Sequence, residues 1–239
     1  MKYKCKLWGI ALAAWLCVDG AYSQMTLVKD GKPVSRIVVP ETNQVNQQAA
    51  TLLQDFVQRI SGSSLPVIEG KKAKKGDIVI GQGNTTGLLE DGFRLSTSDG
   101  ILRISSGGDK GAIYGVVTLL EDYLGVSYYT AHTYTLDQRK TIEIPELDRA
   151  ENPAFRYRQT QSYAVREDPV YKMWFRLEEP SEVFAGNLWV HTFDKILPSS
   201  EFGEKHPEYY SFINGERRPG TASQWCLTYP AWMSKIFLA

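Results

Sequence analysis

Hydrophobic residues recur at helical spacing in two segments of the chain. In residues 45–60 apolar side chains return every three or four positions between glutamines and an aspartate, and Ser61-Gly62 ends the run. In residues 113–124 the same spacing follows a group of glycines, and Gly125 stands where a helix would end. The pattern predicts two helices, each packed on a sheet through one face.

Short β-favouring runs surround these helices. Two pairs of runs flank Asp30-Gly31 and Asp99-Gly100, dipeptides that supply the positive φ of a tight hairpin. The expected strands are residues 26–29 and 34–39, 65–68, 78–80, 93–97 and 101–105, and the tyrosine-bearing run after Gly125. We therefore expect an α+β domain, with two helices on one face of a mostly antiparallel or mixed sheet.

The glycines before the second helix suggest either a phosphate-binding loop or close packing. A nucleotide P-loop requires Lys and then Ser or Thr after its last glycine, but Gly111 is followed by Ala112-Ile113. The spacing of a dinucleotide-binding loop is also absent. Gly111 and Gly115 lie one turn apart, so we expect them to bring the helix close to its sheet, at a propensity cost of about 1 kcal/mol each.

The first 23 residues have the pattern of a secretory signal. Three lysines precede an apolar stretch, residues 7–18, that is too short to span a bilayer, and Ala21-Tyr22-Ser23 provides small residues for cleavage after Ser23. A lipoprotein anchor on Cys17 is the alternative, but Leu16 stands where such sites need a small residue. The product is expected to be periplasmic or secreted, with no membrane association after cleavage.

Composition narrows the function classes further. The chain has 239 residues, of which 43% are hydrophobic and 23% charged, so it can bury a globular core. Of its 27 basic and 27 acidic residues, three lysines and one aspartate precede Gln24, so the rest carries a net charge of −2. No nucleic-acid partner is expected from this balance. Cys226 is the single cysteine after the signal, and no cofactor motif is present.

Three segments occur in an order typical of a known domain: "AATLLQDFVQRISG", "DIVIGQG" and "GFRLSTSDGILRISSGGDKGAIYGVVTLLEDYLG". They resemble the accessory N-terminal domain that precedes the catalytic barrel in bacterial hexosaminidases and alpha-glucuronidases. In that family a "G-x-x-x-G-A-x-Y-G-x-x-T-L-L" segment forms the second helix. It is matched here by Gly107, Gly111, Ala112, Tyr114, Gly115, Thr118, Leu119 and Leu120.

The remainder of the chain carries a second resemblance. "NPAFRYRQT" is similar to the first strand of the barrel in those enzymes, and residues 187–230 resemble an uncharacterised domain in secreted proteins of polysaccharide-degrading bacteria. The resemblance implies a glycosidase-type barrel after the accessory domain. The expected organisation is a signal peptide at 1–23, an accessory domain at 24–148 and the incomplete beginning of a (β/α) barrel at 149–239. A closed eight-stranded barrel needs about 200 residues, so a truncated or N-terminal fragment is expected.

Candidate chemistry is sparse in the part of the barrel that is present. Glycoside hydrolysis uses two carboxyl groups, or one acid and a substrate acetamido group. In barrels these groups lie at strand ends, and the resemblance implies that the acid comes from a middle strand that this chain does not reach. Glu178, Glu179 and Glu182 flank Pro180 and are interpreted as solvated charges. Catalytic residues are therefore not assigned.

Substrate-binding candidates gather near the histidines. His191 follows the strand-like "NLWV" and is expected at a strand end, whereas His206 lies in the loop "HPEYY". The candidate set is His191, Trp189, His206, Asp194, Glu208 and Trp225. Hydrogen bonds to sugar hydroxyls and stacking of tryptophan on a pyranose would be their roles, with structural packing as the alternative. Their spacing supports no metal site, and Cys226 is expected to be buried rather than nucleophilic.

The favoured hypothesis is an exported, glycoside hydrolase-like protein that acts on glycans with hexosamine or uronic-acid units. This fragment is expected to lack the catalytic acid. Two alternatives stay open, a non-catalytic carbohydrate-binding or adaptor protein and an inactive gene fragment. For the hydrolase-like protein and for the binding or adaptor protein, the expected partner is a glycan or oligosaccharide.

Overall fold

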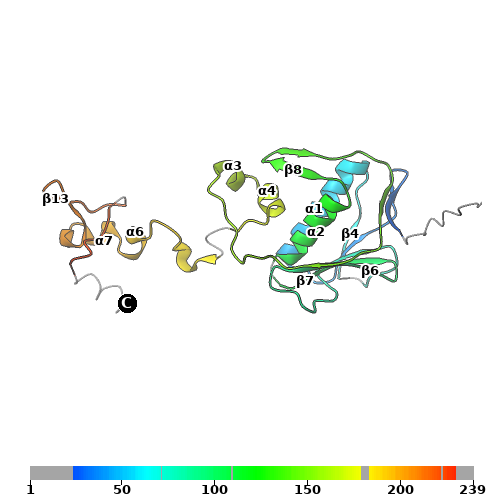
Figure 1. Ribbon diagram of the computed structural model, residues 1–239, viewed down its shortest axis with the longest axis horizontal. Helices are drawn as coiled ribbons and strands as arrows, with labels where there is room; N and C mark the ends of the chain where they lie inside the picture. The colour runs from blue at the N-terminus through cyan, green and yellow to red at the C-terminus, as the bar shows by residue number, and fades with distance from the viewer. Residues whose placement is uncertain (1–23, 71, 109, 179–182, 222, 230–239) are drawn as a thin grey trace, which may run out of the picture. The chain divides into compact units, whose positions relative to one another are not determined.

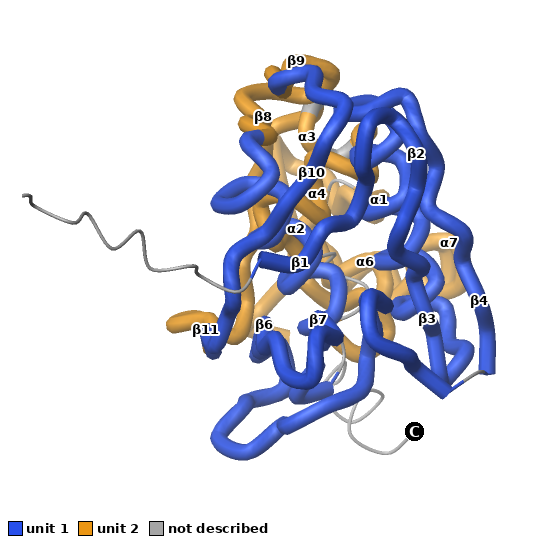
Figure 2. Tube along the Cα trace, turned by 90° about the vertical axis from the view of Figure 1, so that its right-hand side faces the viewer, with its two compact units in different colours: residues 1–125, 137–151 blue, residues 126–136, 152–239 orange. Residues whose placement is uncertain are grey.

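A computed structural model of the protein describes residues 24–70, 72–108, 110–178, 183–221 and 223–229. The predicted signal peptide, Cys17, Glu179 and Glu182 lie outside these ranges. Contacts divide the chain into two compact units, one with residues up to 125 and 137–151, the other with residues 126–136 and those from 152 onward (Figure 2). No helix of the described ranges is long and apolar enough to cross a membrane.

The described residues of the first unit form two helices and two sheets (Figure 1). Its elements are β1 (Met25–Lys29), β2 (Lys32–Pro33), β3 (Ile37–Val39), α1 (Gln44–Ser61), β4 (Val67–Glu69), β5 (Ile78–Ile80), β6 (Phe93–Ser98), β7 (Ile101–Ser106), α2 (Gly111–Asp122), β10 (Ile142–Ile144) and β11 (Asp148–Glu151). The larger sheet has the order β11-β6-β7-β5-β3-β4, with parallel pairs from β7 to β4 and antiparallel pairs at β6. The smaller sheet, β10-β1-β2, is antiparallel. The predicted α+β class and mixed sheet are confirmed.

Both helices cover one face of the larger sheet. Helix α1 contacts β3 and β5, α2 contacts β6 and β7, and the two helices contact each other. Because side chains alternate along a strand, one set of strand side chains is fully buried between the sheet and the helices. Val38, Val79 and Ile101 form a separate small cluster that packs with Ala73. The core of the unit therefore lies between the helices and this sheet.

Local capping signals fix the limits of α1. The Asn43 side chain accepts a hydrogen bond from the Asn46 N–H at 2.8 Å, which satisfies one of the free donors of the first turn. At the other end Gly62 adopts φ 78°, and its N–H donates to the Gln58 carbonyl at 2.8 Å. The helix predicted from the apolar spacing is confirmed.

Helix α2 rests on the sheet through its glycines. A Cβ atom on Gly115 would lie 2.5 Å from Cγ2 of Ile104, and one on Gly111 would overlap the Gly92 carbonyl oxygen. Neither position has room for a side chain, so the packing interpretation of these glycines is confirmed. The helix ends at Asp122, slightly before the predicted end, and Gly125 follows with φ 71°.

The two predicted hairpins have different outcomes. The second is confirmed, because β6 and β7 pair over their full length around Asp99-Gly100. In the first, β1 and β2 pair around Asp30-Gly31, but β2 stops at Pro33, which has no N–H to continue the ladder. Residues 37–39 leave the hairpin and join the larger sheet as β3, in parallel pairs with β4 and β5.

The tyrosine-bearing strand after α2 also leaves the predicted sheet. Strand β8 (Ser127–Thr130) pairs with β9 (Thr133–Thr135) in a separate two-stranded ribbon of the second unit. The chain then returns to the first unit, where β10 pairs with β1 and β11 pairs with β6. The prediction of a strand was correct, but its assignment to the main sheet was wrong.

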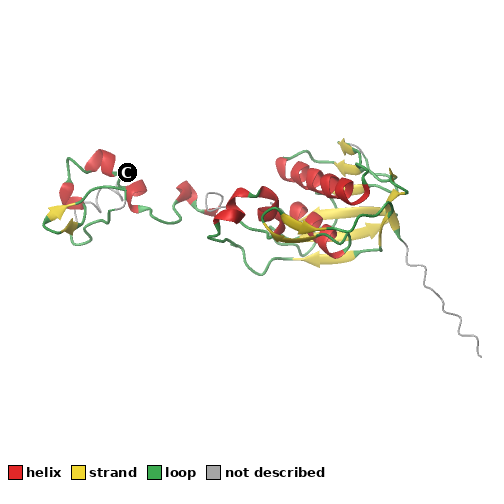
Figure 3. Ribbon diagram, turned by 90° about the horizontal axis from the view of Figure 1, so that it is seen from above, coloured by secondary structure: helices red, strands yellow, loops and turns green. Residues whose placement is uncertain are grey.

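The second unit contains short helices, the β8-β9 ribbon and one further ribbon (Figure 3). Among the described residues its other elements are α3 (Tyr163–Glu167), α4 (Pro169–Trp174), η1 (Ala185–Asn187), α6 (Phe193–Ile196), α7 (Ser199–Phe202), η2 (Pro207–Tyr209), β12 (Phe212–Ile213) and β13 (Glu216–Arg217). Residues 152–160, expected to form the first barrel strand, form no strand. Instead, the Arg158 side chain binds the backbone oxygens of Phe155 and Arg176, so this segment folds back on its own neighbours.

Asp168 joins the β8-β9 ribbon to α4 within this unit. Its side chain is buried and caps α4 by accepting hydrogen bonds from the Val170 and Tyr171 N–H groups at 2.9 and 3.0 Å. It also accepts one from the Tyr128 hydroxyl at 3.2 Å and one from the His132 N–H at 3.0 Å. One carboxylate thus satisfies donors from two elements that are separated in sequence.

Candidate functional site

An aromatic core supports the candidate site in residues 183–229. Leu197, Tyr209 and Tyr210 are buried, and Phe202, Trp225 and Tyr229 pack against them. Tyr210 is tied to this core because its hydroxyl donates to the Leu197 carbonyl at 3.2 Å and its backbone forms a bridge with Trp225. Burial, together with the negative charge of Asp194, raises the pKa of Tyr210.

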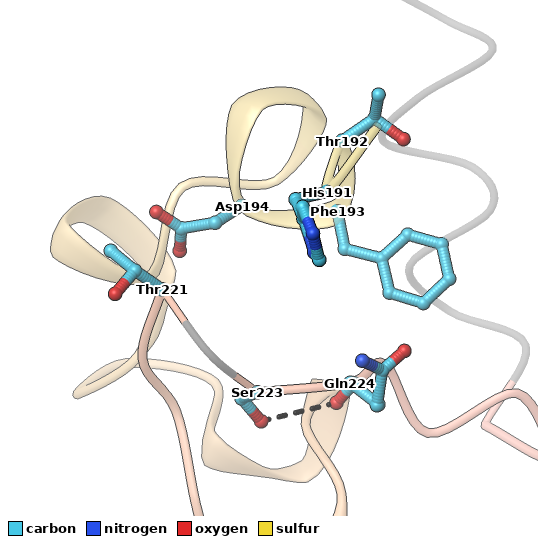
Figure 4. Close-up of a pocket in the computed structure, with 7 residues that line it drawn as sticks. All are labelled: His191, Thr192, Phe193, Asp194, Thr221, Ser223 and Gln224. Carbon is cyan, nitrogen blue, oxygen red and sulfur yellow. Dashed lines mark hydrogen bonds between the residues drawn. The ribbon is translucent and has the colours of Figure 1, made fainter. Parts of the chain in front are cut away.

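A hollow of about 210 Å³ opens beside this core (Figure 4). It is lined by His191, Thr192, Phe193, Asp194, Thr221, Ser223 and Gln224. The lining combines hydroxyl, amide, carboxylate and imidazole groups with one aromatic ring. In Figure 4 the side chains of Asp194 and Thr221 lie on one side of the hollow and Phe193 on the other, with His191 between them.

His191 reaches the hollow from a turn. The preceding Gly186 and Asn187 have φ values of 62° and 56°, and His191 itself has φ 53°, so "NLWV" cannot extend as a strand. The prediction that His191 stands at a strand end was therefore wrong. Its side chain is exposed, and among the described residues none donates to or accepts from its imidazole.

The Asp194 side chain lines the hollow and also forms a hydrogen bond within the protein. It lies in the first turn of α6, and its Oδ1 accepts a hydrogen bond from the Ser199 N–H at 2.8 Å, at the beginning of α7. This bond connects the two short helices and fixes the orientation of the carboxylate. The hollow thus receives an oriented acceptor rather than a mobile surface side chain.

The tryptophan candidates do not line the hollow. The Trp225 ring stacks on Phe193 with centroids 4.4 Å apart and planes 14° from parallel, so it supports the lining from behind. Trp189 is partly buried and is not among the lining residues. The aromatic ring that lines the hollow is therefore that of Phe193.

His206 and Glu208 form a separate pair. Nδ1 of His206 lies 3.1 Å from Oε1 of Glu208, and the imidazole stacks on Tyr209 with centroids 4.6 Å apart. The N–H of Glu208 itself, the His206 side chain and the charge of Arg217 hold the pKa of Glu208 below its ordinary value. The structure therefore brings together His191 and Asp194 but does not place His206 and Glu208 in the same lining.

No metal centre is formed by these groups in the part of the chain that the structure describes. There, no group of three or more His, Cys, Asp or Glu side chains is arranged to hold a metal ion. The set His191, Asp194, His206 and Glu208 therefore does not act as a four-ligand cluster. The geometry is suited to hydrogen bonding of a polar organic ligand.

Two single-residue predictions were wrong. Glu178 is buried rather than solvated, because Arg158 Nη2 lies 2.9 Å from its Oε1 and the Glu178 N–H donates to the Arg158 carbonyl at 2.7 Å. Cys226 is partly exposed rather than buried, with its sulfur 3.4 Å from Oγ1 of Thr228. Hydrogen bonds with Thr228 and Arg217 lower the pKa of the Cys226 thiol.

Five lining residues were not found from the sequence: Thr192, Phe193, Thr221, Ser223 and Gln224. Thr192 and Phe193 immediately follow His191 and are carried into the lining by the same turn. The other three belong to a run of small polar residues after Gly220, which has φ 155°. Such a run between aromatic segments is a weak signal for a polar binding loop.

Two family models match consecutive parts of the chain. Residues 28–122 match the model described as glycosyl hydrolase family 20, domain 2. Residues 128–238 match the model described as a domain of unknown function, DUF4838. A comparison with curated proteins gives no match.

Solved structures with similarity to this chain include three carbohydrate-active enzymes. One is a Vibrio harveyi GH20 exo beta-N-acetylglucosaminidase in complex with N-acetylglucosamine, with 23% identity over 57% of this chain and 18% of that chain, and a TM-score of 0.39. A mutant Streptomyces plicatus beta-hexosaminidase in complex with product GlcNAc has 14% identity over 58% and 25%, with a TM-score of 0.41.

The third is a family GH115 4-O-methyl-alpha-glucuronidase with specificity for decorated arabinogalactans, with 16% identity over 56% and 19%, and a TM-score of 0.43. The matched part spans about a fifth to a quarter of the length of these three structures. The resemblance expected from the sequence is confirmed by the family models: this chain resembles domain 2 of glycosyl hydrolase family 20, followed by a domain of unknown function.

Proposed function

We propose that this chain belongs to an exported, glycoside hydrolase-like protein that acts on glycans with hexosamine or uronic-acid units. The family 20 domain over residues 28–122 supports membership in this broad class of carbohydrate-active proteins. The observation that carries the proposal is the hollow at His191 and Asp194, which lies in the domain that follows. Its convergent polar groups match sugar hydroxyls, and the Phe193 ring offers an apolar surface to the C–H face of a pyranose.

The hollow is suited to binding rather than to hydrolysis by itself. Glycoside cleavage needs two carboxyl groups, or one carboxyl group and a substrate acetamido group, on either side of the bond. Asp194 is the carboxylate among the described lining residues, and its Oδ1 is already bonded to the Ser199 N–H. In the proposed protein the catalytic acid lies outside the described residues. The presence of a single carboxylate among the described lining residues favours non-catalytic carbohydrate binding as the second candidate function.

Removing the His191 side chain is expected to weaken sugar binding about fivefold, because one hydrogen bond contributes a net free energy of about 1 kcal/mol. The variant is His191→Gly, because glycine accepts the positive φ of this position. Its matched control is His132→Gly, at φ 63° with an exposed side chain outside the hollow. Binding of methyl N-acetyl-β-glucosaminide and methyl β-glucuronide would be measured by NMR titration.

The glycan proposal for this hollow would be rejected if neither sugar bound the unmodified protein, or if the two glycine variants lost affinity equally. The same protein is expected to release no chromophore from chromogenic hexosaminides and glucuronides. Measurable hydrolysis would contradict the placement of the catalytic acid outside the described residues.

The proposed export predicts which residue is the first in the mature protein. Cleavage after Ser23 is expected, so mass spectrometry of the protein recovered from cells should identify Gln24 as the first residue. Changing Ala21 and Ser23 to bulky residues should leave the precursor uncleaved, whereas Cys17→Ser should be processed normally. Recovery of an uncleaved chain beginning at Met1, or of a lipid-modified Cys17, would contradict the proposed route.

A further inference from the structure

Asp194 and His191 are the ionisable side chains among the described residues that line the hollow, and none of those residues is a lysine or an arginine. The neighbouring Lys195 is directed elsewhere, since its Nζ donates to the Asn187 carbonyl at 2.8 Å. Arg217 is engaged with the Tyr210 carbonyl at 2.9 Å and lies over the Phe212 ring. An anionic ligand would find no guanidinium or ammonium group among the described lining residues.

Asp194 also has acceptor capacity that the described residues do not use. A carboxylate has two oxygens, and the hydrogen bond from Ser199 occupies Oδ1. Among the described residues no donor is bonded to Oδ2. Figure 4 shows this carboxylate beside Thr221, with the His191 ring nearby. A hydroxyl or amide N–H of a ligand would satisfy the free oxygen, whereas a ligand carboxylate would be repelled.

We propose that the hollow accepts an uncharged glycosyl unit and that Asp194 discriminates against uronic-acid units. This inference rests on the proposed glycan-binding function and disfavours one of its two sugar classes. The Thr221 and Gln224 side chains supply neutral hydrogen-bonding groups for a ligand, and the Ser223 hydroxyl, which donates to the Gln224 carbonyl at 3.2 Å, keeps its capacity to accept. Asp194 is then a specificity-determining residue that acts through its charge.

The expected discrimination follows from Coulomb's law at a solvated surface. Two like charges about 6 Å apart in a medium with a dielectric constant of about 40–80 change a binding constant about threefold to tenfold. Because the hollow is open to solvent, dissolved salt screens this repulsion over a Debye length of about 8–10 Å. The preference for the uncharged sugar is therefore expected to be largest at low ionic strength and to shrink as salt is added.

The test compares two probes, methyl N-acetyl-β-glucosaminide and methyl β-glucuronide, by NMR titration at about 10 mM and about 500 mM salt. The key variant is Asp194→Asn, which removes the charge and keeps an oxygen that can accept the Ser199 N–H. The matched control is Glu201→Gln, an exposed acidic residue on α7 outside the lining. A thermal melt of each variant confirms that its fold is intact.

The expected result is threefold to tenfold tighter binding of the N-acetylated sugar by the unmodified protein and by Glu201→Gln at low salt. Asp194→Asn should lower this ratio by improving glucuronide binding. Equal affinities for the two probes at low salt, or an unchanged ratio in Asp194→Asn, would overturn the proposed role of Asp194 while leaving glycan binding intact. Failure of both probes to bind would instead overturn the glycan-binding function itself.

Discussion

Asp168→Ala is expected to destabilise the second unit by about 2–4 kcal/mol. The change leaves the Val170, Tyr171 and His132 N–H groups and the Tyr128 hydroxyl without their shared acceptor. Loss of a helix cap costs about 0.5–2 kcal/mol, and loss of hydrogen bonds to a buried charged group about 1.5–3 kcal/mol. The residue is only 4% exposed, so water cannot fully replace these bonds.

Asp168→Ala should disturb the residues that contact Asp168 before it unfolds the whole second unit. Amide hydrogen exchange at His132, Val170 and Tyr171 should accelerate, because these N–H groups lose their acceptor. Near-ultraviolet circular dichroism should weaken, since Tyr128 lies 5.4 Å from Tyr134 and 5.2 Å from Trp174, centroid to centroid. The matched control is Glu167→Ala, which removes an exposed negative charge one residue earlier and should leave both signals unchanged.

The Asp168 contribution should also depend on pH in a defined direction. Burial raises the pKa of this carboxyl group, but hydrogen bonds from Tyr171, His132, Tyr128 and Val170 outweigh burial and hold the pKa below 3.8. The depressed native pKa means that stability is present above the unfolded value and is lost as the pH falls through the native one. The stability difference between the unmodified protein and Asp168→Ala should therefore shrink below about pH 4. A constant difference from pH 6 to pH 2 would contradict the assigned role.

Gly115→Ala is expected to destabilise the first unit by about 1–3 kcal/mol, although alanine favours helices by about 1 kcal/mol over glycine. The new Cβ would lie 2.5 Å from Cγ2 of Ile104 and 3.4 Å from the Phe93 ring. Ile104 is fully buried and β-branched, so its side chain cannot rotate away at low cost. Helix α2 would have to lift from the sheet, and the contacts around the new methyl group would weaken.

A double-mutant cycle separates this clash from other causes. Ile104→Ala alone should cost about 2–5 kcal/mol by creating a cavity. The double variant should be less destabilised than the sum of the two single variants by about 1–3 kcal/mol, because the new methyl group enters the space that Ile104 leaves. Urea denaturation provides the three free energies of unfolding. Simple additivity would show that the glycine is not required by the contact with Ile104.

Much of the first unit was predictable because its signals are local. The spacing of apolar residues, the Gly62 cap and the Asp99-Gly100 turn each act within a few residues, and all appear where the sequence places them. The sheet to which a strand belongs depends instead on distant partners. This is why the destinations of β3 and β8 were predicted incorrectly, although both segments form strands.

The candidate site was predictable only in part for the same reason. His191 and Asp194 were identified by residue type and position, and the hollow contains both. The exclusion of His206 and Glu208 depends on their mutual contact and on stacking with Tyr209, which residue spacing does not encode. Likewise, the burial of Glu178 depends on Arg158, which lies 20 positions earlier.

The return of the chain to the first unit after residue 136 affects the order of events during synthesis. Thr26 in β1 pairs with Glu143 in β10, a partner 117 positions later, and β6 acquires β11 from residues 148–151. A nascent chain therefore carries two unpaired strand edges until the ribosome has released these last segments. Edges of this kind readily pair with other chains, so the interval before residue 151 emerges is when chaperones would protect the growing polypeptide most usefully.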